Sequence, residues 1–165
     1  MAYRFLVEKN KKLVYSIAMR VLGNEDDAAD AAQESFLRAY QQLGIYAGKS
    51  RFSTWLYTIT YRICVSRLQS GQAQIFLTNT TPDEDQVDVV ENPHEKLTEK
   101  EQKKLVKEAV EKLAPLDALL VTLYYFDENS INEIAQITEL TASNIKIKLF
   151  RARKILEQEL KFLLE

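Results

Sequence analysis

The sequence predicts an all-α protein. Only four glycines and three prolines occur among its 165 residues. Apolar residues recur at three- and four-residue steps along most of the chain, which is typical of helices that bury one face. This periodicity fails between Ser70 and about Pro93. We therefore expect two small helical domains, residues 1–70 and 95–165, joined by a flexible acidic linker over residues 71–94.

The first domain is expected to contain three helices. Gly23 is a suitable stop for the first helix, and Asn24 is a suitable N-cap for the second, which should run to about Leu43. Ser53 or Thr54 is the expected cap of the third helix. The inner face of the second helix is predicted to consist of Ala29, Ala32, Phe36, Ala39, Tyr40 and Leu43.

Charge is unevenly distributed along the chain. Residues 1–70 hold ten Lys and Arg against six Asp and Glu, whereas residues 71–100 hold two against seven. The whole chain has a net charge of −2. No global field therefore attracts it to nucleic acid, and any such binding has to come from local patches.

The clearest local patch follows Ser130. Ser130 and Glu133 have the spacing of a capping box, Thr138 to Leu140 should break that helix, and Thr141 can cap a second one. From Thr141 to Lys154 the second helix contains no acid and five cations: Lys146, Lys148, Arg151, Arg153 and Lys154. Two short helices of this kind can place side chains in a DNA major groove. An ordinary helical hairpin with a basic outer face is the alternative.

Aromatic and cationic residues alternate between Tyr46 and Arg67, a combination that binds single-stranded nucleic acid through stacking and phosphate contacts. Phe52 and Trp55 could equally be core residues. Tyr57 and Tyr61 are expected to be exposed, because they lie four residues apart on a face away from Ile59 and Ile63. The candidates are Tyr46, Lys49, Arg51, Phe52, Trp55, Tyr57, Tyr61 and Arg62.

The second helix also carries a mixed stripe of Asp30, Gln33, Glu34 and Leu37. This stripe is either a solvated helix face or a docking surface, and the apolar Leu37 favours docking.

No catalytic or metal-binding set is evident. The chain has one histidine and one cysteine, Cys64, which excludes an internal disulfide and favours a core position for the thiol. We expect no enzymatic activity, no cofactor and no metal. The chain shows no apolar run of the roughly 20 residues that a membrane span needs, so a cytoplasmic protein without membrane insertion is expected.

Three segments resemble the extracytoplasmic-function (ECF) sigma factors, small two-domain members of the bacterial sigma-70 family. They are DAAQESFLRAY at residues 30–40, FSTWLYTI at residues 52–59 and LTASNIKIKLFRARK at residues 140–154. These segments are similar to the family's polymerase-binding helix, promoter-melting segment and promoter-reading helix, in that order. The resemblance implies a sigma region 2-like bundle and a sigma region 4-like helix-turn-helix.

The resemblance also implies partners and roles. Core RNA polymerase would be bound at its β′ clamp helices through Asp30, Gln33, Glu34 and Leu37, and also at its β flap. Residues Tyr46 to Arg62 would capture an unstacked base of the minus-ten promoter element. The minus-thirty-five element would be read by Thr141, Ser143, Asn144, Lys146, Lys148 and Arg151, with Lys148 and Arg151 on phosphates. An anti-sigma factor is a further implied partner.

Two departures from the family pattern bear on specificity. Thr58, Tyr61 and Arg62 stand where family members often have arginines and an asparagine, and Ile147 and Lys148 replace a conventional serine and arginine. A sigma-like interaction module that binds polymerase or an anti-sigma factor without opening promoters is therefore the alternative function.

Overall fold

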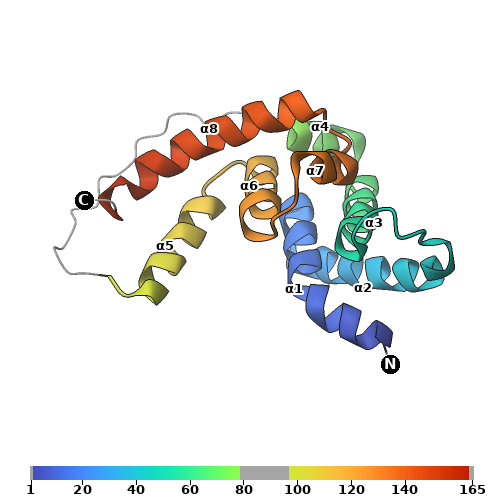
Figure 1. Ribbon diagram of the computed structural model, residues 1–165. Helices are drawn as coiled ribbons and strands as arrows, with labels where there is room; N and C mark the ends of the chain where they lie inside the picture. Colours follow the sequence, from blue (N-terminus) through green and yellow to red (C-terminus); the bar gives the residue numbers. More distant parts are fainter. Residues whose placement is uncertain (1, 79–96, 164–165) are drawn as a thin grey trace.

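Every element that the computed structural model describes, within residues 2–78 and 97–163, is helical. The prediction of an all-α fold is confirmed (Figure 1). The first half contains α1 (Ala2–Leu22), α2 (Glu25–Gln41), the short η1 (Leu43–Ile45), α3 (Phe52–Arg67) and α4 (Ser70–Thr78). The second half contains α5 (Glu99–Glu111), α6 (Pro115–Val121), the π-helical turn η2 (Thr122–Phe126), α7 (Ile131–Thr138), α8 (Ala142–Leu160) and η3 (Lys161–Leu163).

Local signals set most of the helix ends. Gly23 has a positive φ of 71° after α1, and the Asn24 side chain accepts a hydrogen bond from the Asp27 amide at 3.0 Å. The predicted cap of the third helix is wrong. The N-cap of α3 is Arg51, without a side-chain capping bond, and Thr54 lies buried one turn further along.

The buried face of α2 differs from the predicted one by about one residue. The predicted Ala29 and Tyr40 are exposed, whereas the fully buried positions of α2 are Ala28, Ala31, Ser35 and Ala39. The Ser35 hydroxyl donates to the Ala31 carbonyl at 2.6 Å, so this polar side chain is satisfied within its own helix. Small side chains on this face allow α2 to pack closely against α1 and α3.

The expected linker begins with a helix. Residues 70–78 form α4, which packs against α6, and Phe76 is buried. The short apolar run at residues 75–77 therefore belongs to the fold, although nine residues are too few to reveal helical periodicity in the sequence. The rest of the predicted linker, residues 79–94, lies outside the described residues.

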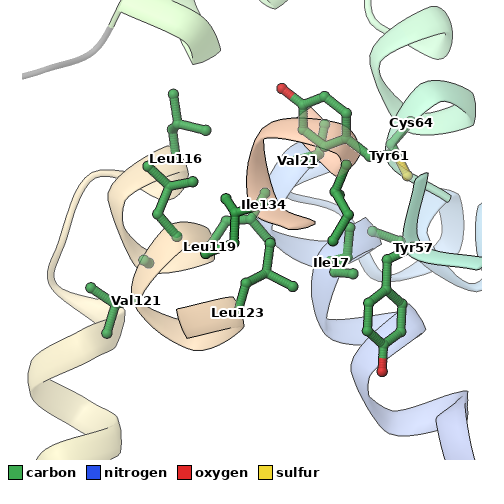
Figure 2. Close-up of a cluster of buried hydrophobic side chains, with 14 of the residues drawn as sticks. Ile17, Val21, Tyr57, Tyr61, Cys64, Leu116, Leu119, Val121, Leu123 and Ile134 are labelled. Carbon is green, nitrogen blue, oxygen red and sulfur yellow. The ribbon is translucent and has the colours of Figure 1, made fainter. Parts of the chain in front are cut away.

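The two halves share one hydrophobic core. α1 packs against α6, and α3 packs against α7. Figure 2 shows the side chains that meet there from α1, α3, α6, η2 and α7: Ile17, Val21, Tyr57, Tyr61, Leu116, Leu119, Leu123 and Ile134. The residues on both sides of the predicted linker are therefore packed together and not separate.

This shared core leads to a first prediction. Ile134 of α7 is fully buried, whereas Trp55, the only tryptophan, lies in α3 of the first half. Ile134→Ala should lower the free energy of unfolding by about 2–5 kcal/mol, because it leaves a cavity in the core. The urea midpoint reported by Trp55 fluorescence should fall together with the midpoint from far-ultraviolet circular dichroism. A Trp55 midpoint equal to that of the parent would show that the halves unfold independently.

Candidate functional site

A half-buried aromatic cluster lies where the loop after η1 meets the start of α3. The ring centroids of Tyr46 and Trp55 are 4.9 Å apart, and those of Phe52 and Trp55 are 5.7 Å apart. The Tyr46 hydroxyl donates to the Ser50 carbonyl at 2.5 Å, which closes the loop. Lys49 is exposed beside the cluster. The cluster thus combines accessible rings with a neighbouring cation, as single-strand binding requires.

Two other aromatic candidates are not accessible. Tyr57 and Tyr61 are only 2% and 4% exposed, so the prediction that they are exposed is wrong. The reason is that α3 packs against α1 and α2 on one side and against α7 on the other. Burial raises the pKa of the Tyr61 hydroxyl to about 12 and raises the pKa of Tyr57 as well.

A polar network surrounds Tyr57. Its hydroxyl lies 3.3 Å from Asn10 Oδ1 and also forms a hydrogen bond with the Asp127 carboxylate. Burial raises the pKa of Asp127, although hydrogen bonds from Asn129 and Tyr57 partly oppose that shift. The network joins α1 and α3 to the segment between η2 and α7.

The arginines predicted to contact DNA pair instead with the second half of the chain. The Arg51 guanidinium donates to Asn129 Oδ1 at 2.8 Å and to the Glu133 carboxylate at 2.7 Å. Arg62 lies 3.2 Å from the Glu139 carboxylate. Both pairs are partly exposed to solvent.

The mixed stripe on α2 lies largely on the surface. Asp30, Gln33 and Leu37 are exposed, and Leu37 keeps 57% of its area accessible. Glu34 is less accessible, because its carboxylate bridges Arg38 at 2.6 Å and Arg67 at 2.5 Å. The hydrogen bond from Arg67 is the main cause that lowers the pKa of Glu34.

The helix-turn-helix forms as the sequence indicates. Ser130 caps α7, and the Thr141 side chain accepts from the Asn144 amide at 3.2 Å to begin α8. The predicted capping box is only half formed, because the Glu133 carboxylate accepts from Arg51 instead of the Ser130 amide. Glu139 between the helices has a φ of 62°, a left-handed conformation that a side chain with a Cβ adopts at a cost. The exposed residues of the predicted set on α8 and its cap are Thr141, Ser143, Asn144, Lys146 and Arg151.

Sequence reasoning missed two apolar residues on this exposed surface. Ile147 and Phe150 are 52% and 53% exposed, and the Lys154 ammonium lies 4.6 Å from the Phe150 ring centroid. Ser143, Ile147 and Phe150 are spaced by four and three residues, so they share one face of α8. That spacing is visible in the sequence, but a stripe of apolar residues usually indicates core.

Lys148 faces the interior. Its side chain is only 4% exposed, so its expected position on the outer face of the helix is wrong. Its Nζ atom and Asp117 Oδ1 of α6 are both buried without a hydrogen-bond partner among the described residues. Burial raises the pKa of Asp117, and the charges of Lys148 and Arg151 partly oppose this. The two buried charges thus link α8 to α6.

Among residues 2–78 and 97–163, no group of histidine, cysteine or carboxylate side chains could hold a metal ion. Cys64 is buried, as expected, and its burial raises the pKa of the thiol to about 12. No helix in the described part of the chain has the length and apolar character needed to cross a bilayer.

Comparison with known families assigns both halves. Residues 6–74 match Sigma-70 region 2, and residues 103–156 match Sigma-70 region 4. The first match contains the α2 stripe and the aromatic cluster, and the second contains the helix-turn-helix. The chain belongs to the ECF group of the sigma-70 family. This sigma factor therefore binds core RNA polymerase, recognises promoter DNA and promotes transcription initiation, and it is not an enzyme.

Similar proteins cover nearly the whole chain. ECF RNA polymerase sigma factor SigW of Bacillus subtilis is 26% identical over 97% of this chain and 89% of its own length. The ECF RNA polymerase sigma-E factor of Escherichia coli K12 is 27% identical over 96% of this chain and 86% of its own. Among solved structures, RpoE of Bartonella quintana in complex with the anti-sigma factor NepR shares the fold. Its TM-score is 0.65, with 18% identity and 97% of each chain covered.

The buried pair of Asp117 and Lys148 gives a second prediction. Lys148→Met should lower the free energy of unfolding by about 1–3 kcal/mol, because it leaves Asp117 buried without its nearest counter-charge. The double variant Asp117→Leu/Lys148→Met should be less destabilised than the sum of the single variants, because no charge then stays unpaired. Urea unfolding of the four proteins measures this coupling. Additive effects would contradict an interaction between the two side chains.

Proposed function

We propose that this sigma factor uses three separate surfaces, one for core polymerase and one for each of the two promoter elements. The polymerase surface is formed by Asp30, Gln33, Glu34 and Leu37 on α2. The minus-ten surface is formed by the loop after η1 and by accessible positions of α3: Tyr46, Lys49, Arg51, Phe52, Trp55 and Arg62. The buried Tyr57 and Tyr61 support it from inside the fold. The minus-thirty-five surface is the outer face of α8.

The polymerase surface would dock on the β′ clamp helices, and the second half would contact the β flap. Support comes from the exposed Leu37, which stands beside Asp30 and Gln33 on an otherwise polar face. An apolar centre with a polar rim is the usual layout of a protein–protein interface. Glu34, held between two arginines, would fix the charge pattern around it and need not contact polymerase directly.

The aromatic cluster of Tyr46, Phe52 and Trp55 is the observation that carries the minus-ten assignment. Extracting a base from the DNA stack costs a few kcal/mol, which a pocket that binds the free base must offset. Stacking on one aromatic side chain contributes about 1–3 kcal/mol per base. Three mutually packed rings beside Lys49 and Arg51 could supply such a pocket together with contacts to the adjoining phosphates.

The minus-thirty-five element would be read in the major groove by Ser143, Asn144 and Lys146, which are exposed near the start of α8. Thr141 and Arg151 would contact phosphates. Ile147 and Phe150 add an apolar strip suited to thymine methyl groups, which favours an A·T-containing element. The burial of Lys148 argues for an internal role of this lysine and against a phosphate contact.

We further propose that the protein acts in the cytoplasm and is held inactive by an anti-sigma factor. The solved structures with similar folds include RpoE with the anti-sigma factor NepR and CnrH with the cytosolic domain of CnrY. CnrH covers 97% of this chain at a TM-score of 0.57.

Transcription in vitro tests the three-surface proposal. With purified core polymerase and a promoter library, the parent should give transcripts. Trp55→Ala should bind polymerase normally but initiate about 5- to 150-fold less, as expected for the loss of one stacked base. Leu37→Glu should instead lose polymerase binding in a pull-down. No transcript from any promoter with the parent would contradict the proposal.

Salt dependence tests the assignment on α8. Arg151→Ala should lower the slope of log affinity against log salt concentration by about 0.9, because the loss of one phosphate contact releases one fewer counterion. Lys148→Met should leave the slope unchanged, since its ammonium is buried. Holoenzyme binding to a selected promoter between 50 and ~200 mM salt gives both slopes. A reduced slope for Lys148→Met would show that this lysine turns outward on DNA.

A further inference from the structure

We propose that Asp117 of α6 is a positioning residue for promoter recognition. Its buried carboxylate holds one edge of α8 against α6 and thereby sets the rotation at which α8 presents its reading side chains. This inference rests on the proposed function of α8 as the minus-thirty-five reading helix. It gives a role in recognition to a residue that lies outside all three proposed surfaces.

Asp117 belongs to a helix that is buried along nearly its whole length. Every residue of α6 from Leu116 to Val121 is buried, and α6 packs against α8 (Figure 1). Asp117 itself is 3% exposed, and its Oδ1 atom has no hydrogen-bond partner in the described part of the chain. Its carboxylate is therefore a fixed negative charge on the inner side of α8.

Lys148 lies at the edge of the buried stripe of α8. It follows the buried Ile145 by three residues, which turns it about 60° to one side of that position. On this side Lys148 stands between Asn144, four residues before it, and Arg151, three residues after it, and both of these are exposed. A small turn of this edge would therefore carry the Lys148 ammonium from the interior to the outer face.

The Lys148 ammonium depends on the carboxylate of Asp117 for compensation. Its Nζ atom is buried and makes no hydrogen bond within residues 2–78 and 97–163. Burial raises the pKa of Asp117, and the charge of Lys148 partly opposes that rise, so the two groups attract each other. A buried ammonium without a counter-charge is costly, and the long stem of lysine lets it reach water. Without the carboxylate, the Lys148 edge of α8 should turn outward.

Apolar packing alone does not fix the rotation of α8. The helix has apolar residues on opposite sides, because Ile145 is buried whereas Ile147 and Phe150 are 52% and 53% exposed. Apolar burial is non-directional, so it tolerates a small turn of the helix. The attraction between Asp117 and Lys148 depends on their separation and acts at one edge only. The charges therefore supply the direction that the packing lacks.

A small rotation is enough to disturb reading. The side-chain tips of an α-helix lie about 5–6 Å from its axis, so a turn of about 20° moves them by about 2 Å. Hydrogen bonds to base edges need donor–acceptor distances of about 2.7–3.2 Å, so this displacement would break base contacts of Ser143, Asn144 and Lys146. Phosphate contacts carry no sequence information. Loss of the Asp117 charge should therefore reduce discrimination between promoter sequences.

Binding of the holoenzyme to two duplexes tests the proposal. One duplex carries a selected promoter, and the other carries the same minus-ten element with a scrambled minus-thirty-five element. Asp117→Leu/Lys148→Met replaces both buried charges with apolar groups, so it should unfold close to the urea midpoint of the parent. Its ratio of the two affinities should nevertheless be at least about fivefold lower, as for the loss of one base contact. Asp117→Glu keeps the charge and should retain the ratio.

Leu120→Ala is the matched control for stability. Leu120 is fully buried on the same helix as Asp117, so its truncation should open a cavity and lower the urea midpoint. Both buried charges remain in this variant, and the ratio of the two affinities should equal that of the parent. A loss of discrimination is thereby separated from a loss of stability.

Acetylation of the free protein by an N-hydroxysuccinimide ester gives a second measurement that involves no DNA. In the parent, the buried Lys148 should react at least about tenfold more slowly than the exposed Lys146 of the same helix. In Asp117→Asn the two rates, measured by peptide mass spectrometry, should differ by less than about threefold, because the neutral amide no longer attracts the ammonium. In Leu120→Ala, Lys148 should stay protected.

Two results would overturn the proposal. An equal affinity ratio for the parent and for Asp117→Leu/Lys148→Met would show that the buried charges do not position the reading side chains. Continued protection of Lys148 in Asp117→Asn would show that the carboxylate does not hold it inside. Failure of the proposed function has a different signature, because the parent itself would then bind both duplexes equally, whereas the acetylation rates do not depend on DNA.

Discussion

The packing of α7 on α3 is the contact on which the rest of the arrangement depends. It closes the core between the two halves through Ile134, buries Tyr57 and Tyr61, and pairs Arg51 with Glu133. The two arginine–glutamate pairs are partly exposed, and such pairs contribute about 0–1 kcal/mol each. Apolar burial therefore supplies most of the stability of the contact, whereas the polar network around Asn129 fixes its register.

A second internal constraint sets the orientation of α8. Lys148 is one of five cations on that helix, yet it faces Asp117 of α6 in the interior. No hydrogen bond or ion pair joins the two side chains, but the charge of Lys148 partly offsets the cost of burying Asp117. Ile145, Leu149 and Ala152 are buried on the same helix as Lys148. Together these four residues turn Ser143, Lys146, Ile147 and Phe150 outward.

The features that were predicted correctly from the sequence are those set by residues close to one another in the chain. Helix ends at Gly23, Asn24, Ser130 and Thr141 follow from side-chain caps or from glycine, which act within a few residues. The all-α fold and the family are confirmed as well. The family resemblance was carried by three short segments, which are also local features of the sequence. The exposure of Tyr57, Tyr61 and Lys148 was predicted wrongly, because it depends on helices far away in the sequence. α3 is packed on two sides, so its sequence shows no polar face from which its contacts could be read.

The balance of charge explains how a chain with a net charge of −2 can serve as a promoter reader. α8 carries five cations against two acids, whereas Arg51 and Arg62 pair with acids of the same chain. Glu133 and Glu139 offset the charges of Arg51 and Arg62, whereas Lys146 and Arg151 on α8 are exposed to solvent. Because salt screens charges beyond about 8–10 Å, a cation acts on DNA only from close range, and the net charge of the whole chain does not decide binding.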